Sequence, residues 1–169
     1  MPTIGVSIAL PDECGTHLQD YRLSLGDELA RQIPSHITLA PPTEIAADQI
    51  DELHAHLQAV ATGQSPFEVH LRGTGTFRPT SPVVFISVVA GISGCERLAK
   101  SVRVGMLDSE SSYPYHPHVT IAHHLDEATM DRAFTEMTGF ECAFEVKSFW
   151  LYTFEEATGW VKSAEFMLG

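Results

Sequence analysis

His36-Ile37-Thr38-Leu39 and His118-Val119-Thr120-Ile121 are two copies of one pattern: a histidine, an apolar residue, a threonine and a second apolar residue. The copies begin 82 positions apart in a chain of 169 residues, which is close to half its length. Side chains alternate between the two faces of an extended strand, so His and Thr share one face and the apolar residues share the other. Each copy therefore predicts a strand that presents a proton-transfer group beside a hydroxyl.

Chance is a poor explanation for the pair. With 9 His and an apolar content of 44%, the composition predicts about 0.15 tetrapeptides of this pattern. Both His-x-Thr triplets of the chain nevertheless carry it. A lone histidine in a strand is more often structural than catalytic, but the pairing indicates one shared site formed by His36, His118, Thr38 and Thr120.

The elements predicted around the two motifs follow the same order in both halves of the chain. Apolar residues at helical spacing predict four amphipathic helices, and alternating or continuous apolar runs predict the strands. The helices are expected at 16–32, 50–60, 93–106 and 127–138; the strands at 3–10, 66–77, 83–89, 140–154 and 160–168, besides the two motif strands, the first of which should stop at Pro41-Pro42.

This repeated order predicts an α+β duplication with a pseudo-two-fold axis. We expect a single domain of two similar lobes, approximately residues 1–80 and 81–169, because no Pro/Ser/Gly-rich linker separates them. In such a bilobal fold, two antiparallel sheets flank a central cleft and the helices lie outside. The two motif strands would then face each other across the cleft.

Composition limits the classes of function. An apolar content of 44% with no run near ~20 apolar residues is typical of a globular domain and predicts no membrane span. The first residues lack a basic segment before an apolar core, so we expect no signal peptide and a cytoplasmic location. A net charge of −12 opposes binding to long duplex nucleic acid. We also expect the protein to be a monomer. Cys14, Cys95 and Cys142 are odd in number and widely spaced, which argues against a disulfide framework.

Two imidazoles on opposite walls of a cleft suit phosphoryl transfer between oxygens. One takes a proton from the attacking hydroxyl or water, and the other protonates the departing oxygen. The hydroxyls of Thr38 and Thr120 can donate hydrogen bonds to the non-bridging oxygens, where charge builds. This scheme requires no metal and no cofactor.

The paired motifs resemble those of the two-histidine phosphoesterase superfamily, which includes bacterial 2′-5′ RNA ligases and cyclic nucleotide phosphodiesterases. Residues 113–120, Tyr-Pro-Tyr-His-Pro-His-Val-Thr, are similar to the second-motif region of its bacterial ligase-like members. The resemblance implies a bilobal fold, metal-independent catalysis by His36 and His118, and phosphate contacts from Thr38 and Thr120. The implied substrate is a 2′,3′-cyclic phosphate or 2′-5′ phosphodiester of a nucleotide or RNA end.

Two other functions are compatible with the sequence. His-x-His on one strand is how many zinc sites begin, so His116, His118, His123 and His124 could instead serve a zinc-dependent hydrolase. A non-catalytic module that binds a cyclic phosphate or RNA end would keep the same cleft. Tyr115, Phe77 and Arg78 could border it, although packing or solvated surface explains each equally well.

Overall fold

Two four-stranded antiparallel sheets and four α-helices make up the described part of the computed structural model, residues 1–108 and 113–169. Sheet A has the strand order β2-β1-β7-β8 and sheet B has the order β5-β4-β3-β6. The strands of sheet A are β2 (His36–Glu44), β1 (Thr3–Ala9), β7 (Ser148–Glu155) and β8 (Gly159–Met167); those of sheet B are β5 (His118–His123), β4 (Val83–Ala90), β3 (Phe67–Thr76) and β6 (Glu141–Val146). The predicted α+β class with two antiparallel sheets is confirmed.

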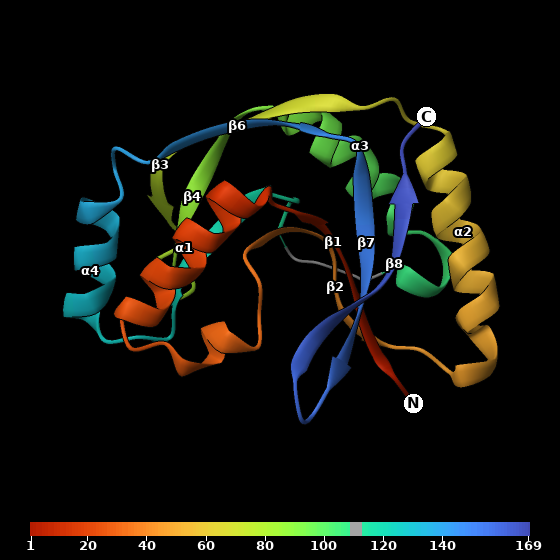
Figure 1. Ribbon diagram of the computed structural model, residues 1–169, viewed down its shortest axis with the longest axis horizontal. Helices are drawn as coiled ribbons and strands as arrows, with labels where there is room; N and C mark the ends of the chain where they lie inside the picture. The colour runs from red at the N-terminus through yellow and green to blue at the C-terminus, as the bar shows by residue number, and fades with distance from the viewer. Residues whose placement is uncertain (109–112) are drawn as a thin grey trace.

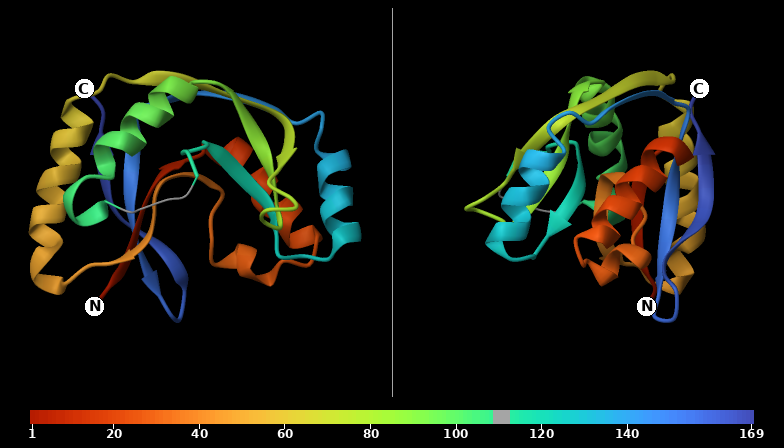
Figure 2. Two further views of the ribbon diagram at one scale, coloured as in Figure 1. Left: turned by 180° about the vertical axis from the view of Figure 1, so that it is seen from behind. Right: turned by 60° about the vertical axis from the view of Figure 1, so that its left-hand side comes forward.

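The helices are α1 (Asp12–Ser24), α2 (Ile50–Thr62), α3 (Ile92–Val102) and α4 (Glu127–Glu136). Helices α2 and α4 lie at opposite outer ends of the molecule, as Figure 1 and the view from behind in Figure 2 both show. Helix α1 packs against β5 of sheet B, and α3 packs against β2 of sheet A. Each of these two helices therefore covers the motif strand that the other half of the chain contributes.

The motif strands β2 and β5 occupy equivalent places. Each is the edge strand of its sheet, each pairs with the first strand of its own half, and the two strands contact each other. Their apolar residues are buried in one hydrophobic core that draws side chains from both sheets. The pseudo-two-fold relation expected from the sequence thus brings the two copies of the motif together.

The sheets exchange strands across the middle of the chain. Strand β3 precedes residue 80 but pairs with β4 and β6 in sheet B, whereas β7 and β8 come last and complete sheet A beside β1. The division into lobes at residues 1–80 and 81–169 stays a prediction about domain organisation. The hydrogen-bonded sheets do not follow that boundary.

Three predicted boundaries were wrong for local reasons. The helix expected at 16–32 ends at Ser24, because Gly26 has a φ of +89° and Asp27 then caps a short 3₁₀ turn, Glu28–Arg31. Strand β2 continues through Pro41-Pro42 to Glu44, since an edge strand tolerates prolines that cannot donate to a neighbour. The segment 140–154 divides into β6 and β7, which enter different sheets.

The expectation against a disulfide was also wrong. Cys14 of α1 and Cys142 of β6 form a disulfide with a Cα–Cα distance of 6.4 Å, while Cys95 is a buried free thiol. The pairing could not be predicted from the sequence, because the two cysteines are 128 residues apart.

Within the described residues, no helix is both long and apolar enough to cross a membrane.

Candidate active site

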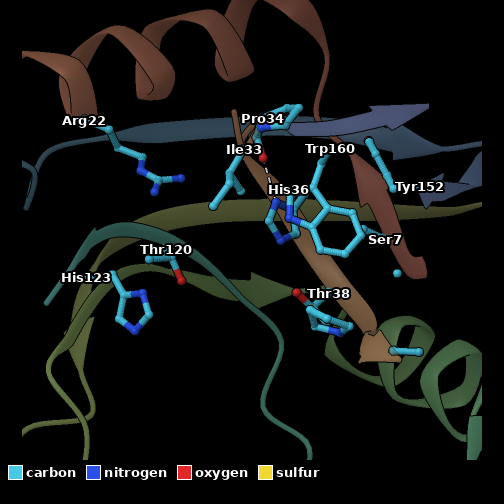
Figure 3. A pocket seen from close by; sticks show the side chains of 13 residues that line it. Ser7, Arg22, Ile33, Pro34, His36, Thr38, Thr120, His123, Tyr152 and Trp160 are labelled. Carbon is cyan, nitrogen blue, oxygen red and sulfur yellow. Dashed lines mark hydrogen bonds between the residues drawn. The ribbon is translucent and has the colours of Figure 1, made fainter. Parts of the chain in front are cut away.

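The two motifs place their side chains as strand alternation requires. His36 and Thr38 are half-buried on one face of β2, and the apolar residues between and after them are fully buried on the other. His118 and Thr120 of β5 repeat this arrangement. Figure 3 shows the hydroxyls of Thr38 and Thr120 directed into the space between the two strands. Neither hydroxyl forms a hydrogen bond within residues 1–108 and 113–169.

Both motif histidines are anchored in the same way. Nδ1 of His36 lies 2.6 Å from the backbone carbonyl of Pro34, and Nδ1 of His118 lies 2.7 Å from that of His116. A carbonyl oxygen can only accept, so Nδ1 carries the proton and donates it. In the neutral ring, Nε2 is then an unprotonated acceptor, and it is the nitrogen of each ring that can exchange a proton with a ligand.

The electrostatic surroundings favour the neutral form of both rings. Burial is the main cause that lowers the pKa of His36, and the positive charge of Arg22 lowers it further against the opposing hydrogen bond to Pro34. Burial also lowers the pKa of His118, and protonation of His116 or His36 lowers it again. The two motif histidines are therefore close enough for a charge on one to disfavour a charge on the other.

A cavity of about 230 Å³ opens beside the first motif. It contains three of the four predicted site residues, His36, Thr38 and Thr120, and it extends over sheet A toward Tyr152 and Trp160 (Figure 3). Its lining is mainly apolar, and the complete set is Gly5, Ser7, Arg22, Ile33, Pro34, His36, Thr38, Ala40, Pro42, Thr120, His123, Tyr152 and Trp160.

The fourth predicted residue, His118, lies beside this cavity without lining it. Its ring packs edge-on against Phe77, with 4.9 Å between ring centroids, and lies 5.2 Å from Phe85. Aromatic packing therefore fixes the ring plane of His118 while its Nδ1 is held by the backbone. Phe77 thus contacts a motif residue. From the sequence alone, this role could not be distinguished from ordinary packing.

The two halves of the site differ at one pair of equivalent positions. Ser7 of β1 lies opposite Thr38, whereas Phe85 of β4 lies opposite Thr120. The Phe85 ring covers Gly75 so closely that a Cβ at residue 75 would lie 2.6 Å from two of its carbons. A small side chain thus leaves the cavity open over sheet A, and an aromatic ring fills the corresponding space over sheet B.

The remaining candidates fall in different places. Arg78 pairs with Glu127 and Asp131 of α4, at 3.2 and 2.8 Å, and does not line the cavity. His123 lines the cavity, and its ring lies 3.9 Å from that of His124.

The zinc alternative needs a cluster of ligands. The ring centroids of His116 and His118 lie 6.0 Å apart, and the pair at 123 and 124 lies at the far end of β5. Among the residues that the structure describes, no three His, Cys, Asp or Glu side chains gather closely enough to hold a metal ion.

Several residues that line the cavity were not predicted as site residues from the sequence. Tyr152 and Trp160 reach the cavity from β7 and β8, and burial raises the pKa of the Tyr152 hydroxyl to about 12. Ser7 and Arg22 come from β1 and α1. None carries a local signal, because their role depends on which strands pair and on which helix crosses to which sheet.

The chain is similar to proteins of known family. A family model for the 2′-5′ RNA ligase superfamily matches residues 10–158. A protein of Staphylococcus haemolyticus named "putative phosphoesterase" is 26% identical over 155 residues, 90% of each chain. A Bacillus cytotoxicus protein with the same description is 31% identical over 96 residues, and that match covers 57% of this chain and 55% of the relative.

Solved structures show the same fold. Escherichia coli LigT in its apo form superposes with a TM-score of 0.72 at 23% identity, covering 99% of this chain and 98% of LigT. LigT complexed with 3′-AMP gives a TM-score of 0.69, also at 23% identity, with 99% of both chains covered. The resemblance drawn from the paired motifs is thereby confirmed: because the family model spans most of its length, the chain belongs to the 2′-5′ RNA ligase superfamily.

Proposed function

We propose that this protein is a metal-independent phosphoesterase that opens 2′,3′-cyclic phosphates, or acts on 2′-5′ phosphodiesters, of nucleotides or RNA ends. The observation that carries the proposal is the matched anchoring of His36 and His118. Each ring donates from Nδ1 to a backbone carbonyl two residues earlier, which leaves Nε2 for proton transfer. Membership of a superfamily whose relatives are named phosphoesterases supports the same reaction class.

The reaction needs only groups that the two motifs supply. A water oxygen attacks phosphorus and gives its proton to the neutral Nε2 of one histidine. The bond from phosphorus to O2′ or O3′ breaks, and that oxygen takes a proton from the other histidine. Without a ligand the surroundings favour the neutral form of both rings, so this second histidine is protonated when the negative charge of the bound phosphate favours the imidazolium. Thr38 and Thr120 donate hydrogen bonds to the non-bridging oxygens as their charge increases. The product is a phosphomonoester, and the two histidines have exchanged protonation states.

The size and lining of the cavity favour a small substrate. Its volume of about 230 Å³ is below the ~300–1,000 Å³ typical of pockets for drug-sized ligands, so it suits a single nucleotide or the last residue of a strand. Trp160 and Tyr152 offer aromatic surface on which a base can stack. LigT was crystallised with 3′-AMP, which is the kind of monoester that an opened 2′,3′-cyclic phosphate yields.

The test is a panel of the four 2′,3′-cyclic nucleotides and of oligonucleotides ending in a cyclic phosphate. Products are separated as 2′- or 3′-monoesters, with and without a chelator. Turnover that the chelator leaves unchanged supports the proposal. Turnover abolished by the chelator would favour a metal-dependent hydrolase, and ligand-induced thermal stabilisation without product would favour a binding module.

A further inference from the structure

Arg22 is a buried cation in the wall of the cavity that the proposed mechanism does not use. Among the described residues that line the cavity, it is the only lysine or arginine. It belongs to α1, the helix that crosses onto β5, and it is only 4% exposed. Figure 3 shows its guanidinium reaching from α1 toward the space between His36 on one side and Thr120 and His123 on the other.

One acidic side chain holds this guanidinium in place. Nη2 of Arg22 lies 3.0 Å from Oδ2 of Asp27, which is 7% exposed. The other oxygen of Asp27 accepts the backbone N–H of Leu29 at 3.2 Å, so the carboxylate is itself fixed at the start of the 3₁₀ turn. The pair is thus oriented by the chain segment that leads to the first motif.

The guanidinium is not fully satisfied by this contact. Nε of Arg22 is buried and has no hydrogen-bond partner within the described residues. Leaving a charged donor buried and unpaired is costly, because the group has lost its water without gaining an acceptor. An oxygen supplied by a ligand in the cavity would remove that cost.

Electrostatics agree with this position. The positive charge of Arg22 lowers the pKa of both His36 and His123, two residues that line the cavity. Its electrostatic effect therefore reaches into the cavity. The chain as a whole carries a net charge of −12, which repels anions. The threonine hydroxyls supply dipoles but no charge. A second local cation beside the protonated histidine would therefore strengthen phosphate binding, and a guanidinium can meet phosphate oxygens with two parallel N–H donors.

We propose that Arg22 is the anion-binding residue of the site, donating from its guanidinium to a non-bridging oxygen of the substrate phosphate, with Asp27 as the residue that positions it. This inference deepens the proposed function and rests on the same cavity. It identifies the phosphate group as the part of the substrate that Arg22 recognises. The phosphate would then be bound between Arg22 and the two threonine hydroxyls.

Inorganic phosphate is the probe that tests this inference, because its binding requires no turnover. In the wild-type protein labelled with ¹⁵N, titration with phosphate is expected to shift the side-chain Nε–H resonance of Arg22 saturably. That resonance is assigned by its loss in Arg22→Lys. Arg22→Gln is expected to weaken phosphate binding by about 10- to 100-fold, as expected for a charge-assisted hydrogen bond, and Arg22→Lys by less.

Arg31→Gln is the matched control, since Arg31 is exposed and, among the described residues, forms an ion pair with Glu28 alone. It is expected to bind phosphate as the wild type does. Equal phosphate affinity in the wild type and a folded Arg22→Gln would overturn the inference, as would a wild-type Nε–H signal that stays fixed while the amides of Thr38 and Thr120 shift. If Arg22→Gln does not fold, the wild-type titration decides. Absence of cyclic-phosphate turnover would count against the proposed function alone.

Discussion

The hydroxyl of Tyr115 donates a hydrogen bond of 2.6 Å to the backbone carbonyl of Thr38, which joins the segment before the second motif to the strand that carries the first. The guanidinium of Arg103 lies 5.0 Å from the centre of the Tyr115 ring and donates to the carbonyl of Leu39 at 2.6 Å. Burial raises the pKa of Tyr115, so its hydroxyl keeps its proton. Two side chains from the second half thus fix the backbone of β2.

Tyr115→Phe should therefore loosen the link between the motifs. Removal of the hydroxyl leaves the Thr38 carbonyl without this donor, and we expect a loss of about 1–3 kcal/mol in the free energy of unfolding, together with a lower kcat for a cyclic nucleotide. Urea unfolding and steady-state kinetics measure the two effects. Tyr21→Phe serves for comparison, because the Tyr21 hydroxyl donates to Glu136 in an exposed contact away from β2. Wild-type stability and kcat in Tyr115→Phe would show that the contact is dispensable.

His36→Asn and His118→Asn test the proton transfers. The side-chain amide of Asn can replace Nδ1 as the donor to the carbonyl of Pro34 or His116, so the fold is expected to persist. Each variant should lose about 10²- to 10⁴-fold in kcat, or roughly 3–5 kcal/mol of transition-state stabilisation. His70→Asn is the control, because His70 pairs with Glu141 away from the cavity. Near-wild-type turnover by either folded motif variant would contradict the mechanism.

The stability of the fold should fall as the solution becomes more acidic. The pKa values of His36 and His118 are lower in the folded protein than the usual 6.5, mainly because of burial. Below pH 6.5 the unfolded chain therefore binds more protons than the folded chain, and the free energy of unfolding decreases as the pH falls toward the folded pKa values. Urea unfolding at pH 7, 6 and 5 measures this change.

The double variant His36→Asn/His118→Asn separates the contribution of the two motif histidines to this pH dependence from that of the other titratable groups. Its free energy of unfolding should decrease less between pH 7 and pH 5 than that of the wild type. His123 also has a lowered pKa, so part of the slope should remain. An identical slope in both proteins would mean that the motif histidines are not the groups responsible.

Gly75→Ala tests the aromatic packing behind His118. The added Cβ would lie 2.6 Å from the Phe85 ring, so that ring must move, and it is in contact with His118. We expect a loss of about 1–3 kcal/mol in the free energy of unfolding from overpacking, and a reduced kcat. Gly139→Ala, where no atom lies within 4 Å of the added carbon, is the matched control. Unchanged kcat in Gly75→Ala would show that the ring can shift without disturbing the histidine.

Much of the fold could be predicted because its signals are local. The His-x-Thr alternation and the helical spacing of residues such as Leu53 and Leu57 each depend on a few neighbouring residues. The same alternation placed His36, Thr38 and Thr120 on faces that meet at one cavity. Their catalytic and binding roles stay predictions.

The features that could not be predicted depend on distant partners. Nothing near Arg22 distinguishes it from a solvated helix residue, because its burial follows from the crossing of α1 onto β5. The pairing of Cys14 with Cys142 and the approach of Trp160 to the cavity likewise require the assembled sheets. Gly26 stopped the first helix early through a left-handed conformation that helical spacing alone does not reveal.

The exchange of strands between the halves also sets how much of the chain must be present before the cavity is complete. Gly5 of β1 pairs with Tyr152 of β7, so sheet A cannot close until these two distant segments have met. Until then the first histidine motif lies on an incomplete sheet. A fragment that ends before residue 148 would carry both motifs and still lack the Tyr152 and Trp160 walls of the cavity, so ligand binding should require the hairpin formed by β7 and β8.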